Sequence, residues 1–207
     1  MKLAGVSVVD LSMFLPGPHF TLMMADHGAD VIRIEPPAGE PSRDYGLRLG
    51  DHSVWFRNTH RGKRSLKLNL KDPRGKALLL KLLEKADVLV EGFRPGVMKR
   101  LGLDYDTVRA HAPQIIYCSI SAFGQTGPYR DKPAHDMAVQ ALAGTLGFNR
   151  GQDGAPTNPG LPAADITSSM FALSGVLMAL LKQRQTGQGD YVDIAMHDSL
   201  LAWTPNY

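Results

Sequence analysis

Residues 6–35 read VSVVDLSMFLPGPHFTLMMADHGADVIRIE and contain a complete strand–helix–strand pattern. The β-branched run at 6–11 ends in a turn rich in proline and glycine, and an apolar helical segment follows it. Gly28 is a natural helix stop, and residues 30–35 again have strand character. The stretch therefore predicts one βαβ unit.

Strands and helices continue to alternate after this unit. An irregular stretch at 36–51 is followed by a half-exposed strand at 65–70. Asp72 and Pro73 then form a favoured pair for opening a helix. We expect further strands at 88–91, 115–120 and 191–195, further helices at 97–101, 105–112, 135–146 and 166–186, and the start of a last helix near His197. Because the strands are apolar enough to be covered on both faces, the sequence predicts an α/β fold, a Rossmann-like, open and mostly parallel sheet flanked by helices.

The composition is that of an ordinary globular protein. Of the 207 residues, 43% are hydrophobic and 21% are charged, and neither low-complexity tracts, internal repeats nor an obvious linker divide the chain. We expect one continuous, soluble and folded unit. The formal net charge of +3 is too small for a dedicated nucleic-acid binder and fits an anionic small-molecule partner better.

Membrane attachment, disulfides and metal sites are all disfavoured. No run approaches the about 18 apolar residues that a membrane span requires, so we expect neither a signal peptide nor an anchor. The single cysteine, Cys118, excludes an internal disulfide and a thiolate metal cluster, and it favours a cytoplasmic location. The seven histidines lack close metal-ligand spacing, and we predict no metal.

The chain lacks the short motifs of several large enzyme classes. It contains no GxxxxGK[ST] phosphate loop, no GxGxxG, no HExxH and no GxSxG. This argues against nucleotide hydrolases, Rossmann dehydrogenases and serine hydrolases.

Two basic segments lie at the edges of predicted strands. One runs over residues 57–71, and the other holds Arg94, Lys99 and Arg100. A single run of charge is usually a solvated face. Since ligands of open α/β sheets bind at the carboxyl ends of the strands, these segments are also candidates for binding phosphate.

Asp165 directly precedes the apolar helix predicted at 166–186. Its structural role would be that of an N-cap, accepting hydrogen bonds from the backbone amides of Thr167 or Ser168. A functional role is compatible with this one. The helix dipole and the free amides would hold the carboxylate ionised, as a carboxylate nucleophile requires.

Several segments, in order and in register, resemble one enzyme family. The matching stretches are FLPGP at 14–18, GADVIRIEP at 28–36, KRS at 63–65 with LNLK at 68–71, ADVLVEGFRPG at 86–96, SAFGQTGP at 121–128, Asp136 with Gln140 and Ala141, and TGQGDYVD at 186–193. The chain resembles the family III CoA-transferases, a group that includes formyl-CoA transferase, carnitine CoA-transferase and α-methylacyl-CoA racemase. The resemblance covers the whole chain.

The resemblance implies an enzyme that moves coenzyme A between an acyl-CoA and a carboxylic acid acceptor. Its nucleophile would be Asp165, which would form an aspartyl–acyl anhydride and then an aspartyl–CoA thioester. By position, the family's CoA contacts map to Leu15, Pro16, Leu68, Lys71, Gly92, Phe93, Arg94 and Arg100. Lys71 and Arg100 suit phosphates, and Phe93 suits an apolar wall. The formyl-CoA enzyme has other residues where Leu15 and Pro36 stand, so a different substrate is expected.

Two alternatives stay open beside the transferase. The pair His135 and Asp136 is similar to the His–Asp pair that racemases use as a base, with His135 and Asp165 then on opposite faces of an enolate. Against a racemase, the segment at 166–169 lacks a glycine-rich start. The other alternative is a catalytically silent CoA-binding remnant.

The resemblance also bears on domains and assembly. Family members are longer and form interlocked homodimers, so residues 1–207 are interpreted as the N-terminal portion of the large CoA-binding domain, without the small domain and the C-terminal return. We expect little transferase activity from these residues alone, because a reactive anhydride needs shielding from water.

Overall fold

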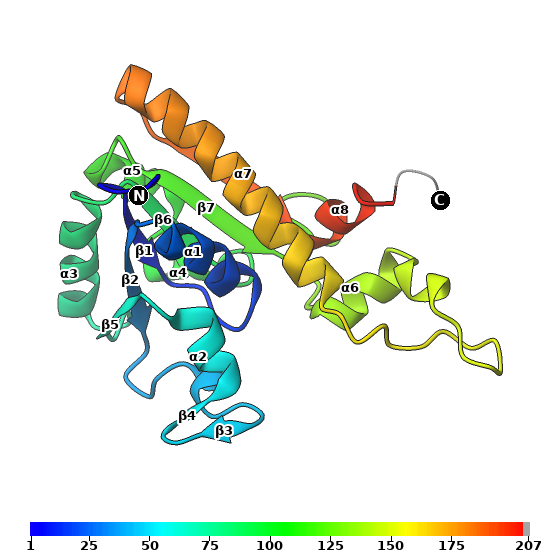
Figure 1. Cartoon of the computed structure of the whole chain (residues 1–207). Coiled ribbons are helices and arrows are strands. Elements are labelled where there is room, and N and C mark those ends of the chain that lie inside the picture. Colours follow the sequence, from blue (N-terminus) through cyan, green and yellow to red (C-terminus); the bar gives the residue numbers. More distant parts are fainter. Residues whose placement is uncertain (205–207) are drawn as a thin grey trace.

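Residues 1–204 are described by a computed structural model, in which six parallel strands form one sheet (Figure 1). The order across the sheet is β5-β2-β1-β6-β7-β8. The strands are β1 (Ser7–Asp10), β2 (Asp30–Glu35), β5 (Arg64–Lys67), β6 (Val88–Glu91), β7 (Ile116–Ser121) and β8 (Asp190–Ala195). The predicted fold class, an open parallel α/β sheet, is confirmed.

Helices cover both faces of this sheet because successive strand residues point to opposite sides. In β1, Val8 belongs to the core on one face and Val9 to the core on the other. The first face carries the helices α1 (Pro16–Asp26), α6 (Asp136–Leu142), α7 (Ala163–Thr186) and α8 (Met196–Leu201), and the second carries α3 (Pro73–Leu83), α4 (Val97–Leu101) and α5 (Tyr105–His111) (Figure 1). The two layers of helices account for the apolar strands.

The longest helix, α7, crosses the face of the sheet that it shares with α1 (Figure 1). By length and composition alone it could cross a membrane. Its buried residues pack against α1 and the sheet, whereas Met178 and Leu181 are 65% and 68% exposed. Because β8 follows α7 and is parallel to the other strands, α7 must begin at the carboxyl edge of the sheet. Asp165 is therefore brought to the edge where ligands of such sheets bind.

The chain reverses its direction across the sheet between β1 and β6. From β1 it proceeds to β2 and β5 on one side, and it then returns to place β6 on the other side of β1. Ligands bind at such a switch point, outside the carboxyl ends of the strands. The two turns that meet there lie close together, since a Cβ built on Gly92 would be 3.5 Å from Cβ of Ser12.

Several boundaries differ from the expectation. The strand predicted at 65–70 ends at Lys67 and is exposed throughout, because β5 is the edge strand. The helix predicted at 135–146 ends at Leu142, and a short 3-10 helix, η2 (Thr145–Phe148), follows Gly144 at φ 79°. The region from Pro36 to the start of β5 holds elements that were not predicted, namely η1 (Pro41–Arg43), the hairpin of β3 (Arg48–Leu49) and β4 (His52–Ser53), and α2 (Val54–His60).

Candidate active site

Asp165 is the third residue of α7, and a different carboxylate caps this helix. Oδ1 of Asp136 accepts hydrogen bonds from the backbone nitrogen of Ala164 at 2.8 Å and from that of Asp165 at 3.1 Å. The expectation that Asp165 is itself the N-cap is therefore wrong. Because Asp136, 29 residues before Asp165, supplies the cap, the carboxyl group of Asp165 is not needed to cap the helix.

The cap is itself held in place by a buried amide. Nε2 of Gln140 donates to Oδ2 of Asp136 at 2.5 Å and to the carbonyl oxygen of Leu161 at 2.9 Å. Gln140 thus joins α6 to the loop that leads into α7. Both oxygens of Asp136 are occupied by donors, which fixes its orientation.

The ionisation of Asp165 differs from the expectation. Burial, together with the nearby charge of Asp136, raises the pKa of Asp165 to about 7. The helix dipole and free amides were expected to hold this carboxylate ionised. They do not dominate, because the amides of Ala164 and Asp165 are already taken by Asp136. A partly desolvated carboxylate that ionises near neutral pH is a competent nucleophile.

A serine one turn along α7 connects Asp165 to the start of α1. Oγ of Ser169 lies 2.7 Å from the carbonyl oxygen of Asp165 and 2.8 Å from that of Pro16. Leu15 and Pro16, both predicted CoA contacts, are therefore held beside the helix turn that carries Asp165. Gly17 allows close packing within the turn before α1, because a Cβ added there would lie 2.2 Å from Cβ of Ser12.

The turn after β6 carries three of the other predicted CoA contacts, and α4, which follows it, carries Arg100. The backbone nitrogen of Phe93 donates to Oε2 of Glu91 at 2.8 Å, and the hydroxyl of Ser119 donates to Oε1. Burial raises the pKa of Glu91 to about 7. Gly92 is exposed and Phe93 is half-buried, and Arg94 and Arg100 are exposed. Glu91, which was not predicted, anchors this turn.

The remaining predicted contacts lie beyond the edge strand. Leu68 lines a concavity of about 350 Å³ together with Asn69, Asp72 and Arg74. Lys71 is exposed nearby. Since β5 is two strands away from β1, and neighbouring strands are spaced about 4.8 Å apart, these residues lie roughly 10 Å along the sheet from the first turn. Only an extended ligand could reach both groups.

Part of the predicted basic segment is unavailable to a ligand. Nζ of Lys63 is buried, 3.2 Å from Oδ2 of Asp10 and 2.7 Å from Oγ1 of Thr21. Burial lowers the pKa of Lys63 to about 8. Burial opposes the ionisation of Asp10, but Lys63 and Arg33 outweigh it and hold the pKa of Asp10 well below its usual range. Lys63 is thus a structural cation, and this member of the basic segment is not available to bind phosphate.

His135 is exposed and directly precedes α6, one residue before Asp136. The fold therefore brings His135, Asp136 and Asp165 into one neighbourhood. Within residues 1–204, no group of three or more His, Cys, Asp or Glu side chains could hold a metal ion.

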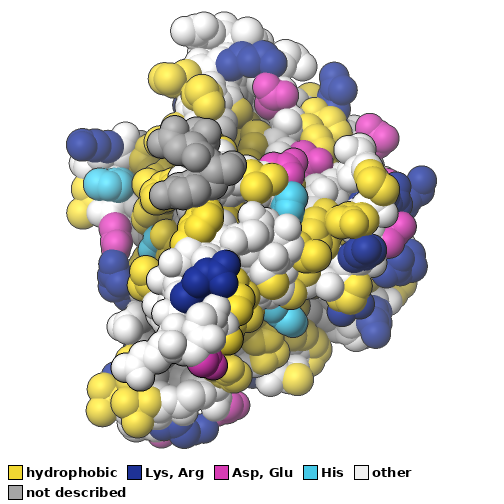
Figure 2. Space-filling model, turned by 90° about the vertical axis from the view of Figure 1, so that its right-hand side faces the viewer, with side chains coloured by type: hydrophobic (Ala, Val, Ile, Leu, Met, Phe, Trp, Pro, Cys, Tyr) yellow, Lys and Arg dark blue, Asp and Glu magenta, His cyan; other side chains and the backbone are white. Residues whose placement is uncertain are grey.

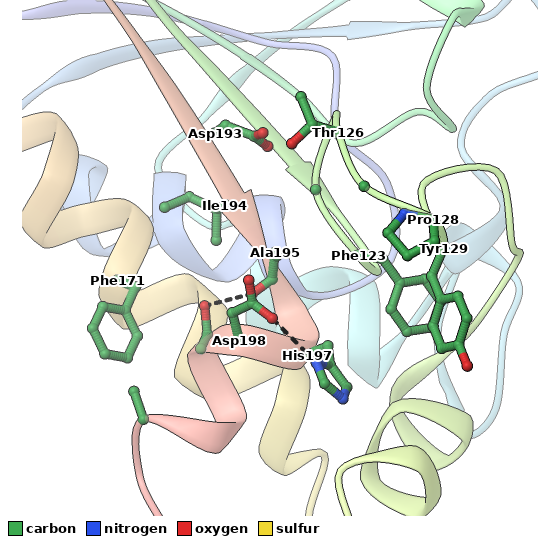
Figure 3. A pocket seen from close by; sticks show the side chains of 14 residues that line it. Phe123, Thr126, Pro128, Tyr129, Phe171, Asp193, Ile194, Ala195, His197 and Asp198 are labelled. Atoms are coloured by element: carbon green, nitrogen blue, oxygen red, sulfur yellow. Dashed lines mark hydrogen bonds and ion pairs between the residues drawn. The ribbon is translucent and has the colours of Figure 1, made fainter.

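A larger hollow, of about 590 Å³, lies at the carboxyl ends of β7 and β8. Phe123 and Tyr129 line one side of this hollow, and Phe171 of α7 lines the opposite side (Figure 3). His197 and Asp198 also line it, with 3.1 Å between Nδ1 of His197 and Oδ1 of Asp198. No predicted site residue lines it. Asp165 lines neither hollow, and its side chain is half-buried.

Apolar side chains interrupt the polar surface on the side that carries α6 and α8 (Figure 2). Leu142 is 55% exposed and Trp203 is 61% exposed.

Comparisons with known proteins match the chain to one family of enzymes. The model of the family described as CoA-transferase family III matches residues 3–207. Acetyl-CoA:oxalate CoA-transferase from Acetobacter aceti is 43% identical over 201 residues, which cover 96% of this chain and 52% of that relative. Succinate–glutarate CoA-transferase from Agrobacterium fabrum is 37% identical over 204 residues, which cover 95% of this chain and 51% of that relative.

A solved structure has the same fold over the whole chain. A CAIB/BAIF family protein from Brucella suis superposes with a TM-score of 0.95 at 33% sequence identity, covering 100% of this chain and 56% of that one. The chain spans about half the length of the curated relatives that it matches.

Proposed function

Because the chain belongs to CoA-transferase family III, we propose that it transfers coenzyme A between carboxylic acids, with Asp165 as the nucleophile. One observation supports this role above the others. The amides at the start of α7 are bound by Asp136, so the carboxyl group of Asp165 is not needed as a cap and is free to react. The partly buried setting, in which the pKa of Asp165 is raised to about 7, leaves the ionised form poorly solvated and therefore reactive.

The proposed first half of the reaction releases the donor acid. The ionised Asp165 oxygen attacks the thioester carbonyl carbon, a C–O bond forms, the C–S bond breaks, and CoA leaves as a thiolate. The thiolate sulfur then attacks the aspartyl carbonyl carbon of the anhydride. A C–S bond forms there, and the donor acid leaves as its carboxylate. The enzyme then holds an aspartyl–CoA thioester, and no net proton has been taken up or released.

The second half repeats these steps in reverse with a new acid. A carboxylate oxygen of the acceptor attacks the aspartyl–CoA carbonyl carbon, forming a new anhydride and releasing the thiolate. The thiolate attacks the acceptor's acyl carbon, which yields the new acyl-CoA and restores the Asp165 carboxylate. Each step exchanges bonds of similar energy, which is the advantage of covalent catalysis.

The CoA molecule is proposed to lie along the carboxyl edge of the sheet. Its reactive end would pass the turn of Leu15 and Pro16, beside Ser169 and Asp165. Gly92 and Phe93 would contact it at the switch point, and the exposed cations are suited to its phosphates. Those cations are Arg94, Arg100 and, beside Leu68, Lys71.

The proposed acceptor is a short dicarboxylic acid. The names of the two relatives specify oxalate and glutarate. We also propose that the whole protein acts in the cytoplasm as a homodimer, with the apolar surface around α6 and α8 as a contact face.

Trapping of the acylated aspartate tests the proposal. The chain is incubated with acetyl-CoA and hydroxylamine, and peptide mass spectrometry is expected to find a hydroxamate at Asp165. Asp165→Asn should give none and should still bind CoA, while Asp131→Asn, a change at an exposed carboxylate, should behave as wild type. CoA binding without any hydroxamate would instead indicate a silent CoA-binding remnant.

A second measurement separates the transferase from a racemase. A racemase that used His135 and Asp165 would exchange the α-proton of a 2-methylacyl-CoA with deuterium from solvent in the absence of any acceptor acid. We expect no deuterium exchange at the α-carbon, and rapid exchange would contradict the proposed transferase activity.

A further inference from the structure

Phe14 has a backbone conformation that is costly for an aromatic residue. Its φ is +63°, and within residues 1–204 no other non-glycine residue has a positive φ. Such a conformation costs of order 1–3 kcal/mol and persists only where the surroundings impose it. The Phe14 side chain is 37% exposed. Burial of this ring therefore does not explain the strained conformation.

Two side chains hold the backbone of Phe14 from both sides. Its N–H donates to Oε1 of Glu40 at 2.9 Å, and its carbonyl oxygen accepts from Nε1 of Trp55 at 3.2 Å. Glu40 is buried, and its oxygens lie 3.5 Å from the guanidinium of Arg33 and 3.5 Å from Nε2 of His60. The anchor of Phe14 is consequently rigid.

The ring of Phe14, which belongs to the proposed CoA-binding turn, contacts the residue that directly precedes α6. It meets the ring of His135 edge to face, with 6.5 Å between centroids and an interplanar angle of 84°. His135 precedes Asp136, whose Oδ1 is 3.1 Å from the Asp165 nitrogen. On the other side, Pro16, two residues after Phe14, is tied to the turn of Asp165 through Ser169.

We propose that Phe14 is a specificity-determining residue that forms the end wall of the acyl site and restricts the substrates to short acyl groups. This inference rests on the proposed function, because it assumes that the acyl group reaches Asp165. A rigidly held ring between the CoA-binding turn and the cap of the nucleophile blocks extension of the acyl chain in that direction. Since hydrophobic sites discriminate between chain lengths mainly by steric fit, one fixed ring is sufficient.

The test compares acyl-CoA binding by the wild type and by Phe14→Gly. Glycine adopts a positive φ without strain, so this variant removes the ring and retains the turn. Binding of CoA, acetyl-CoA and hexanoyl-CoA is measured by calorimetry. We expect the ratio of the hexanoyl-CoA to the acetyl-CoA dissociation constant to fall by about tenfold in Phe14→Gly, with the affinity for CoA itself unchanged.

Two controls accompany this variant. Leu47→Ala removes an exposed apolar side chain from the same part of the chain and should leave all three affinities unchanged. Phe14→Leu keeps an apolar side chain and should change the ratio less than Phe14→Gly does. Thermal unfolding of each variant confirms the folded state.

The outcomes separate this inference from the proposed function. An unchanged ratio in Phe14→Gly, with a normal hydroxamate at Asp165, overturns the role of Phe14 and leaves the transferase standing. A changed ratio of dissociation constants without any hydroxamate supports the role of Phe14 in limiting acyl length and contradicts Asp165 as the nucleophile. Absence of binding to all three ligands in the wild type overturns both.

Discussion

Oδ1 of Asp136 lies 3.1 Å from the backbone nitrogen of Asp165, so that one carboxylate caps the helix on which the other is carried. Two negative charges are thereby placed close together in a partly buried setting. The consequence is a carboxyl group that holds its proton to nearly neutral pH. The capping carboxylate of Asp136 and the proposed nucleophile Asp165 are therefore electrostatically coupled.

Asp136→Asn tests this coupling. Asparagine retains an acceptor for the cap but removes the charge that raises the pKa of Asp165, so hydroxamate formation should reach its half-maximal rate at a pH below the wild-type value of about 7. The measurement is the pH profile of hydroxamate formation. Asp136→Ala should in addition lose about 1 kcal/mol of stability, since the cap is removed. An unshifted profile in Asp136→Asn would show that burial alone sets the pKa.

Asp165→Asn should stabilise the fold at high pH. The pKa is 3.8 in the reference state and about 7 in the fold. The folded protein therefore binds more protons between these values, and its stability falls as the pH rises through that window. We expect Asp165→Asn to raise the unfolding free energy by about 1–3 kcal/mol near pH 8 and by much less near pH 4. Thermal unfolding at the two pH values measures this, and an equal effect at both would contradict it.

Glu91→Gln should weaken CoA binding and remove part of its pH dependence. Ionised Glu91 accepts from the Phe93 amide and from the Ser119 hydroxyl, whereas glutamine offers one acceptor oxygen. Loss of about 1 kcal/mol corresponds to a roughly fivefold weaker affinity. Because burial raises the pKa of Glu91 to about 7, wild-type affinity should rise between pH 6 and pH 8 more than that of the variant. Calorimetry at both pH values is the measurement, and parallel pH profiles would refute the anchoring role.

Gly17→Ala should destabilise the first turn. The added Cβ would lie 2.2 Å from Cβ and Oγ of Ser12, a buried residue that has little room to move. Overpacking of this kind costs about 1–3 kcal/mol. Gly147→Ala is the matched control, since nothing lies within 4 Å of its Cβ position. Urea unfolding compares the two variants, and equal midpoints would show that the turn shifts freely.

The sequence predicted correctly the elements that have a clear hydrophobic period or a clear boundary residue. β2 and β6 have the predicted bounds, and Asp72 caps α3 as expected, its side chain accepting from the Arg74 nitrogen. The helix α2 was missed because its seven residues, VWFRNTH, mix aromatic and polar side chains without an amphipathic repeat. Its one local signal is Ser53, whose hydroxyl caps it by accepting from the Phe56 nitrogen.

Two features of the site that sequence reasoning missed depend on contacts distant in the chain. Asp136 caps α7 from 29 residues away, and Lys63 meets Asp10 across 53 residues. A run of charge has the same appearance in a sequence whether its members are buried or solvated. A clue to the burial of Lys63 was present in Asp10, a carboxylate at the end of an otherwise apolar strand that requires a partner.

The burial of Lys63 and Arg33 divides the cations of this chain into two populations. Those two are already neutralised inside the protein and are shielded from dissolved ions, whereas Arg94, Arg100 and Lys71 stand in water. Added salt should consequently weaken the attraction of the exposed cations for an anionic ligand and leave the buried ion pairs of Asp10 nearly unchanged. Salt dependence of anion binding and salt dependence of stability are therefore expected to differ in this protein.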